Sequence, residues 1–177
     1  MYQEEIKIPK ERIAILIGKK GKTKKEIEDK TQTKITVSSK EGDVSIKGED
    51  SLNIYKAAHI IKSIGRGFNP DIATNLLNKD FCLEIINIKD FSGKSKKDLL
   101  RLKSRIIGTK GKARRIIEHS TDCEISIYGK TVCIIGEVEK AILAREAIEK
   151  LLAGSPHSNV YKWLDKTKHQ KTHEEIT

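Results

Sequence analysis

Two hydrophobic periodicities run along the chain, and the shorter one predicts strands. Apolar and polar residues alternate over residues 5–8, over Lys34–Ser38 and over residues 43–47. Alternation with period two is typical of a strand with one buried face. Gly42 lies between the last two segments, where it suits a turn. These segments predict one strand near the start and, later, two strands joined by a turn.

Helical spacing fills the intervals between these strands. Residues 13–17 form an apolar run that predicts a short buried helix, and Lys22–Thr31 predicts a second helix that buries Ile27. Asp50 or Ser51 can cap a third helix. Its apolar face consists of Ile54, Ala57, Ala58, Ile61 and Ile64. The predicted order is strand–helix–helix–strand–strand–helix.

The same pattern occurs a second time. Residues 106–136 repeat residues 16–48, so that Gly18 and Gly21 correspond to Gly108 and Gly111 at an offset of 90 residues. The second copy is two residues shorter between its predicted strands, Glu124–Tyr128 and 131–135, where a loop can absorb the change. The apolar face of its last helix consists of Val138, Ala141, Ala144, Ile148, Leu151 and Leu152. The chain therefore contains one duplicated unit.

The segment between the two copies predicts a connection. Asn69-Pro70 has the form of a helix cap followed by proline in the first turn, which predicts a short linker helix through Leu77. Residues 81–88 predict the first strand of the second copy. This strand lies further from its glycines than the first copy's strand does, so residues 89–97 predict an inserted loop.

The end of the chain predicts a short docked segment. Val160, Trp163 and Leu164 are spaced for one helical turn, and the polar residues from 166 onward predict a frayed end. We therefore expect a first domain over 1–67, a linker helix over 68–80 and a second domain over 81–154. A C-terminal docking segment and polar tail would occupy 155–177.

Net charge narrows the class of partner. The chain has 177 residues and a formal charge of +10, which favours nucleic acid or an acidic membrane surface. No apolar run approaches the ~20 residues that span a bilayer, and residues 1–10 lack the apolar core of a signal peptide. We therefore expect nucleic acid and no membrane. The three cysteines have no close pairing, which predicts reduced thiols and a cytoplasmic protein.

The glycine loops decide between two phosphate-binding motifs. A Walker A loop requires Gly-x-x-x-x-Gly-Lys-Ser/Thr after a strand. Leu16 and Ile106 occupy the position of its first glycine, Ala113 replaces the hydroxyl residue in the second copy, and a helix precedes each loop. The sequence therefore argues against a nucleotide-binding enzyme.

Gly-x-x-Gly between two short helices resembles the signature of the KH domain, whose loop clamps about four nucleotides of a single strand. Glycine lets the sugar-phosphate chain approach the peptide closely. Because the motif occurs twice, each time in the full element order, we expect an α+β fold of two tandem type I KH domains. Each domain would be a three-stranded sheet packed on helices.

Basic residues gather at both loops, while acids lie elsewhere. A lone basic cluster is usually a solvated helix face, but two clusters centred on the two loops favour RNA binding. The predicted RNA-binding residues of the first copy are Gly18, Lys19, Lys20, Gly21, Lys22, Lys24 and Lys25. Those of the second are Arg105, Gly108, Thr109, Lys110, Gly111, Lys112, Arg114 and Arg115.

Base recognition would use an apolar groove between the helix after each loop and the second strand. Its residues in the second copy are Ile117, Ile125 and Ile127, although most such residues pack in a core. Aromatic residues make up 5% of the chain and none lies in either loop. Extensive base stacking is therefore not expected.

Catalytic and metal-binding patterns are not found. The five histidines show no ligand spacing with the cysteines, and no Ser/His/Asp set is suggested. Cys123 sits where a small buried residue is expected. We predict a protein that is not an enzyme and needs no cofactor or metal.

Several short sequence segments narrow the resemblance from KH domains in general to one family. "GRGF" followed by "NPDIATNLL", "KSRIIGTKGKARRIIEHST", "YGKTVCIIG" and "GSPHSNVYKWL" together resemble the archaeal branch of the Dim/partner-of-Nob family, relatives of the Krr ribosome-assembly proteins. The resemblance implies binding of precursor small-subunit ribosomal RNA near its 3′ end. It also implies maturation of the pre-small subunit beside the Nob endonuclease, with the nuclease chemistry in that partner.

The motifs leave two questions open. The first question is function, because a general regulator that binds single-stranded RNA or DNA through tandem KH domains would carry the same motifs. Lys24 and Arg114 also depart from the aliphatic residue that KH domains carry three positions after the second glycine. Both loops are intact. The denser arginine cluster favours the second copy as the main binder, because a planar guanidinium can form two parallel hydrogen bonds and stack, whereas a lysine ammonium acts as a point charge.

Overall fold

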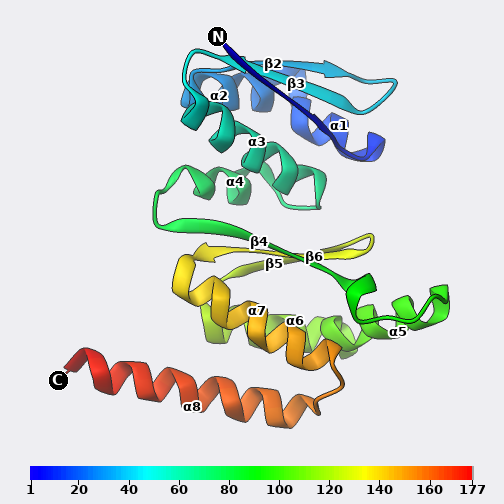
Figure 1. Ribbon diagram of the computed structural model, residues 1–177, viewed down its shortest axis with the longest axis vertical. Helices are drawn as coiled ribbons and strands as arrows, with labels where there is room; N and C mark the ends of the chain where they lie inside the picture. The colour runs from blue at the N-terminus through cyan, green and yellow to red at the C-terminus, as the bar shows by residue number, and fades with distance from the viewer. Residues whose placement is uncertain (177) are drawn as a thin grey trace. The chain divides into compact units, whose positions relative to one another are not determined.

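The computed structural model describes residues 1–176, which form two compact units that divide between Leu83 and Glu84. Each unit contains one three-stranded sheet covered by helices (Figure 1). The predicted fold class and the predicted duplication are therefore confirmed. The division at residues 67, 80 and 154 stays a prediction.

The first unit follows the predicted element order. Its elements are β1 (Tyr2–Lys7), α1 (Lys10–Ile17), the 3-10 turn η1 (Lys19–Gly21), α2 (Lys22–Thr31), β2 (Lys34–Ser38), β3 (Asp43–Gly48) and α3 (Ser51–Gly65). The sheet order is β1-β3-β2, with β3 antiparallel to both neighbours. Asp50 caps α3 by accepting a hydrogen bond from the Leu52 nitrogen at 2.8 Å.

The second unit repeats this order with a longer first helix and an additional C-terminal helix. Its elements are β4 (Phe81–Asn87), the 3-10 turn η3 (Ile88–Asp90), α5 (Lys96–Ile107), the 3-10 turn η4 (Thr109–Gly111), α6 (Lys112–Thr121), β5 (Glu124–Tyr128), β6 (Thr131–Glu137), α7 (Val138–Leu152) and α8 (His157–Ile176). The sheet order is β4-β6-β5. Helix α5 begins at Lys96, inside the predicted inserted loop, because Ser95 caps it through the Asp98 nitrogen at 3.1 Å.

The predicted linker helix packs within the first unit. It consists of α4 (Pro70–Ala73) and the 3-10 turn η2 (Thr74–Leu77), and both contact α3. Ala73 and Leu76 are buried there. This segment is therefore part of a hydrophobic core.

Helix α8 corrects the prediction for the C-terminus. We expected one docked turn and a frayed end, whereas the helix continues to Ile176. Val160 and Leu164 are buried, as expected for docking, and α8 packs on α6 and α7 (Figure 1). The polar half contains no helix-breaking glycine or proline, and its ion pair of 3.8 Å between Lys171 and Glu139 of α7 is exposed and contributes little. Thr177 lies outside the described residues.

Each long helix ends against an arginine from the helix before the glycine loop. Arg12 donates to the carbonyl oxygens of Ile64 and Phe68 at 2.8 and 3.0 Å. In the second unit Arg105 donates to those of Leu151 and Ser155 at 3.1 and 2.5 Å. Carbonyls at a helix end lack intrahelical partners, and each arginine binds one of these together with one carbonyl of the segment that follows the helix. Each arginine therefore ties α1 to the end of α3, or α5 to the end of α7.

We predict that Arg12→Ala lowers the free energy of unfolding by about 2–3 kcal/mol, because two charge-assisted hydrogen bonds are lost. Chemical denaturation measures the effect. Lys10→Ala, at an exposed residue of the same helix, is the matched control and should change stability by less than about 0.5 kcal/mol. Equal effects of the two substitutions would contradict the anchoring role of Arg12.

Candidate nucleic-acid interface

The two glycine loops have the same backbone conformation. Gly18 and Gly108 each have φ of 73°, and Gly21 and Gly111 each have φ of 74°. The residue before the second glycine, Lys20 or Lys110, also has positive φ, at 54° and 52°. Each loop closes with a 3.2 Å hydrogen bond from the second glycine nitrogen to the first glycine carbonyl. The duplicated sequence therefore builds the same turn twice.

The first glycine of each loop is required by packing inside the unit. A Cβ atom on Gly18 would lie 2.9 Å from the Thr23 backbone nitrogen, and one on Gly108 would lie 2.7 Å from the Ala113 nitrogen. Such distances leave no room for a side chain. The helix after the loop can therefore pack closely only if this residue is glycine.

The second glycine of each loop faces open space. A Cβ atom on Gly21 would meet nothing within 4 Å, and one on Gly111 would have its nearest neighbour, Arg115 Nη1, at 3.5 Å. Positive φ favours glycine here, and the missing side chain leaves the backbone open to a ligand. The room for a sugar-phosphate chain that we expected at both glycines therefore exists at the second one.

Exposed cations surround this open backbone. Lys19, Lys20, Lys22 and Lys25 are exposed in the first unit, and Thr109, Lys110 and Lys112 are exposed in the second. Lys22 forms an exposed 3.9 Å ion pair with Glu26, which contributes little in water. Among residues 1–176, Lys19, Lys20, Lys110 and Lys112 form no ion pair. Their charges are available to a polyanion.

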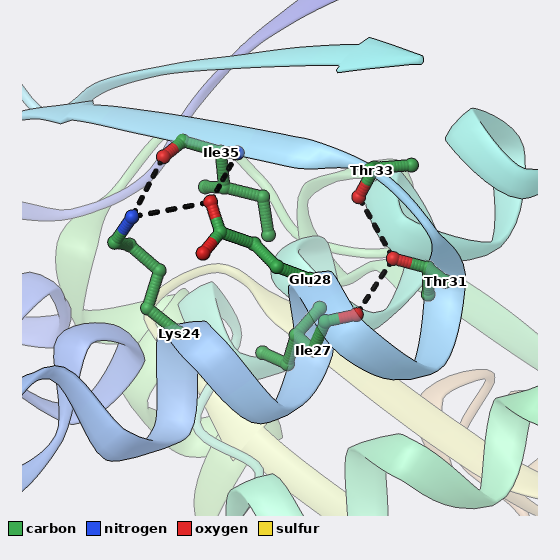
Figure 2. A network of polar contacts seen from close by, with 6 residues as sticks. All are labelled: Lys24, Ile27, Glu28, Thr31, Thr33 and Ile35. Atoms are coloured by element: carbon green, nitrogen blue, oxygen red, sulfur yellow. Dashed lines mark hydrogen bonds and ion pairs between the residues drawn. The ribbon is translucent and has the colours of Figure 1, made fainter. Parts of the chain in front are cut away.

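Lys24 belongs to an internal polar network of the first unit (Figure 2). Its Nζ atom donates to Glu28 Oε1 at 3.2 Å and to the Ile35 carbonyl at 2.9 Å. Glu28 in turn accepts from the Ile35 nitrogen at 2.7 Å. The network ties α2 to β2, so the Lys24 ammonium is engaged within the first unit.

The second unit keeps this network but changes its cation. Glu118 accepts from the Ile125 nitrogen at 3.0 Å, as Glu28 does from Ile35. Arg114 occupies the position of Lys24, and its buried Nε atom has no hydrogen-bond partner among the described residues. A buried donor is normally satisfied. The Arg114 side chain therefore carries a buried donor without a partner, whereas Lys24 has two partners.

The other predicted arginines hold local structure. Arg105 anchors the end of α7, and Arg115 Nη1 donates to the Lys110 carbonyl at 2.8 Å, which fixes the loop. Arg101, a further arginine of α5 close to the predicted residues, pairs with Asp98 at 2.7 Å. The arginine cluster of the second unit is therefore less available to a ligand than the sequence suggests.

An open hollow of about 530 Å³ adjoins the second loop. Thr109 and Lys112 line it from the loop side, Arg101 from α5, and His157 and Tyr161 from α8. A tyrosine phenol is neutral at physiological pH and can donate a hydrogen bond, and burial raises the pKa of Tyr161 further. No pattern in the sequence indicated that α8 would reach the loop.

The predicted apolar groove is mostly closed. Ile117 and Ile125 are 0% and 4% exposed, so these two predicted RNA-binding side chains lie in the core. Ile127 is half-buried. Ile107, which we did not predict, is 36% exposed directly before Gly108. Its position in an apolar run next to the motif is the signal that could have identified it.

Residues 1–176 contain neither a metal-binding cluster nor a membrane-spanning helix. No group of three or more His, Cys, Asp or Glu side chains is arranged to hold a metal ion there. In the same residues, no helix has both the length and the apolar character needed to cross a membrane.

The element order, the sheet order and the Gly-x-x-Gly turn between two helices define each unit as a KH domain. Models of known families agree. Residues 82–169 match the eukaryotic type KH domain (KH-domain type I), and residues 3–63 match the KH domain. The chain belongs to the Dim2/PNO1 family of tandem KH-domain proteins.

Individual relatives support this assignment. A KH domain-containing protein of Methanocaldococcus jannaschii is 45% identical, over 92% of this chain and 73% of the relative. A structure of an a/eIF2alpha–aDim2p–rRNA complex from Pyrococcus horikoshii shows 50% identity and a TM-score of 0.88, over 96% of this chain and 95% of the matched chain. The pre-rRNA-processing protein PNO1 of Debaryomyces hansenii is 33% identical over 63% of this chain, which spans 44% of that relative's length.

We predict that alanine destabilises the protein more at the first glycine of a loop than at the second. Gly108→Ala should lower the free energy of unfolding by more than about 3 kcal/mol, because steric overlap adds to left-handed strain. Gly111→Ala should lower it by about 1–2 kcal/mol, from strain alone. Urea denaturation compares them. A Gly111→Ala variant that is the less stable of the two would contradict this division of roles.

Proposed function

We propose that the protein holds single-stranded ribosomal RNA near the 3′ end of the small-subunit rRNA, and so assists small-subunit assembly and maturation. The open backbone at Gly21 and Gly111 is the observation that carries the proposal. Helices α2 and α6 begin directly after these glycines, and the start of a helix favours phosphate. The surrounding unpaired lysines add long-range attraction for the same ligand.

The relatives support the ligand class. The Pyrococcus horikoshii relative aDim2p forms a complex with rRNA and a/eIF2alpha, and the Debaryomyces hansenii relative PNO1 is a pre-rRNA-processing protein. On this proposal the protein is not an enzyme and works in the cytoplasm. The Nob endonuclease would act beside it on the pre-small subunit and would supply the nuclease chemistry.

The second domain is the stronger binder in this proposal. Arg114 has an unused Nε donor beside its loop, whereas Lys24 is already bound to Glu28 and to the Ile35 carbonyl. On this proposal the Arg114 side chain reorients when RNA binds, and a hydrogen bond to RNA then gives this unsatisfied donor a partner. The hollow lined by His157 and Tyr161 gives the strand further contacts next to the same loop.

Aspartate at the two middle residues of one loop should disable that loop without unfolding the domain, because all four residues are exposed. We expect T109D/K110D to weaken binding of a single-stranded RNA by about 100-fold or more, and K19D/K20D to weaken it by about tenfold. Fluorescence anisotropy measures both affinities, and thermal unfolding controls for folding.

The first of these variants removes less positive charge than the second. A larger loss with T109D/K110D therefore cannot come from net charge. Equal losses would contradict the dominance of the second domain. Unchanged affinity in both variants would contradict the clamp itself.

A second test addresses the identity of the RNA. We expect the wild-type protein to prefer a strand that copies the 3′ end of small-subunit rRNA over a scrambled strand of equal length. The preference should survive a rise from about 50 to about 200 mM salt, while both affinities fall through counterion release. Equal affinities at both salt concentrations would instead favour a general regulator that binds single strands through tandem KH domains.

A further inference from the structure

The inserted segment before α5 builds a second basic site that the glycine loops do not explain. Four lysines and two serines line an open hollow of about 490 Å³, which we call the lysine hollow: Lys89, Ser92, Lys94, Ser95, Lys96 and Lys130. The lysines come from η3, from the inserted segment, from the start of α5 and from the β5–β6 turn. Residues far apart in the sequence therefore place like charges together.

A backbone hydrogen bond fixes this arrangement. The Ile88 nitrogen donates to the Lys130 carbonyl at 2.9 Å, so the neighbouring residue Lys89 is held next to the turn that carries Lys130. A side-chain hydrogen bond with Lys89 lowers the pKa of Lys130, and charge repulsion from Lys89 lowers it further. Lys96 adds weaker repulsion in the same direction. Juxtaposed ammonium groups of this kind oppose folding and favour an anion.

No carboxylate neutralises these lysines. Among residues 1–176, Lys89, Lys94, Lys96 and Lys130 form no ion pair with an acid. The nearby carboxylate of Asp98 is engaged elsewhere, since it accepts hydrogen bonds from the Gly93 nitrogen at 2.5 Å and from Arg101 at 2.7 Å. The positive charge of the hollow is therefore left for a ligand.

The first domain provides an internal comparison. There the Ile8 nitrogen donates to the Gly42 carbonyl at 3.0 Å, which is the counterpart of the bond from Ile88 to Lys130. Pro9 and Gly42 stand where the second domain has Lys89 and Lys130. The fold therefore forms without lysines at these two positions, so packing does not require them.

We infer that the lysine hollow binds phosphate groups of the RNA backbone at a site separate from the second glycine loop. Helix α5 runs from the hollow to the loop over 12 residues, a rise of about 18 Å. A strand held by the loop is tethered near the hollow, which raises the effective concentration of its other phosphates. Lysines suit this role as point charges without fixed geometry. The inference rests on the proposed function, because the same RNA must occupy the loop.

The test compares two RNA lengths and two charge-matched variants of the full chain. K89Q/K130Q removes two charges from the hollow, and K162Q/K168Q removes two charges from exposed positions of α8. Each protein is titrated with a six-nucleotide and a twenty-nucleotide single-stranded RNA at several salt concentrations. Thermal unfolding verifies that the variants remain folded.

We expect K89Q/K130Q to weaken binding of the twenty-nucleotide RNA by about tenfold and to reduce the slope of log K against log salt by about 1.4. Binding of the six-nucleotide RNA should be unchanged, and K162Q/K168Q should bind both strands like the wild type. Wild-type affinity of K89Q/K130Q for the long strand would overturn the inference and favour an acidic protein segment as ligand. Equal losses in both variants would overturn it in favour of a general charge effect. Failure of the wild type to bind either strand would instead overturn the proposed function.

Discussion

The close approach of the first glycine of each loop to the following helix is the constraint on which the site depends. Gly18 packs against Thr23 and Gly108 against Ala113 at distances that exclude any side chain. This contact forces the chain to turn between two helices and gives the next two residues their exposed positions. The second glycine can then have positive φ and face open space. One packing contact therefore creates the ligand-accessible backbone.

A second set of contacts keeps this turn rigid. Glu28 and Glu118 tie the helix after each loop to the strand that follows, and Arg12 and Arg105 tie the helix before it to the end of the last helix. Because both flanking helices are fixed, the loop needs little ordering when a strand binds, which reduces the entropic cost of association. Arg115 adds a direct bond to the second loop.

Periodicity predicted the regular elements well, because each is short and has one buried face. Lys22–Thr31, Lys34–Ser38 and Glu124–Tyr128 have their predicted bounds, and the duplication supplied an independent check. The prediction for the C-terminus was wrong beyond the first turn of α8, since the helix docks on α6 and α7 and its polar residues include no glycine or proline that would end it. The anchoring of Arg105 on carbonyls far along the chain could not be read from the sequence, whereas the burial of Ile117 and Ile125 follows the rule that most such residues pack in a core. The RNA contacts of the loop residues stay a prediction.

The central claim is that RNA phosphates lie against the backbone of the second glycine loop, and amide chemical shifts test it most directly. A ¹⁵N-labelled full chain would be titrated with a six-nucleotide single-stranded RNA. We predict that the largest shifts fall on the amides of residues 109–113, with smaller shifts at residues 19–23. Shifts confined to the lysine side chains, or amide shifts centred away from both loops, would contradict a backbone clamp.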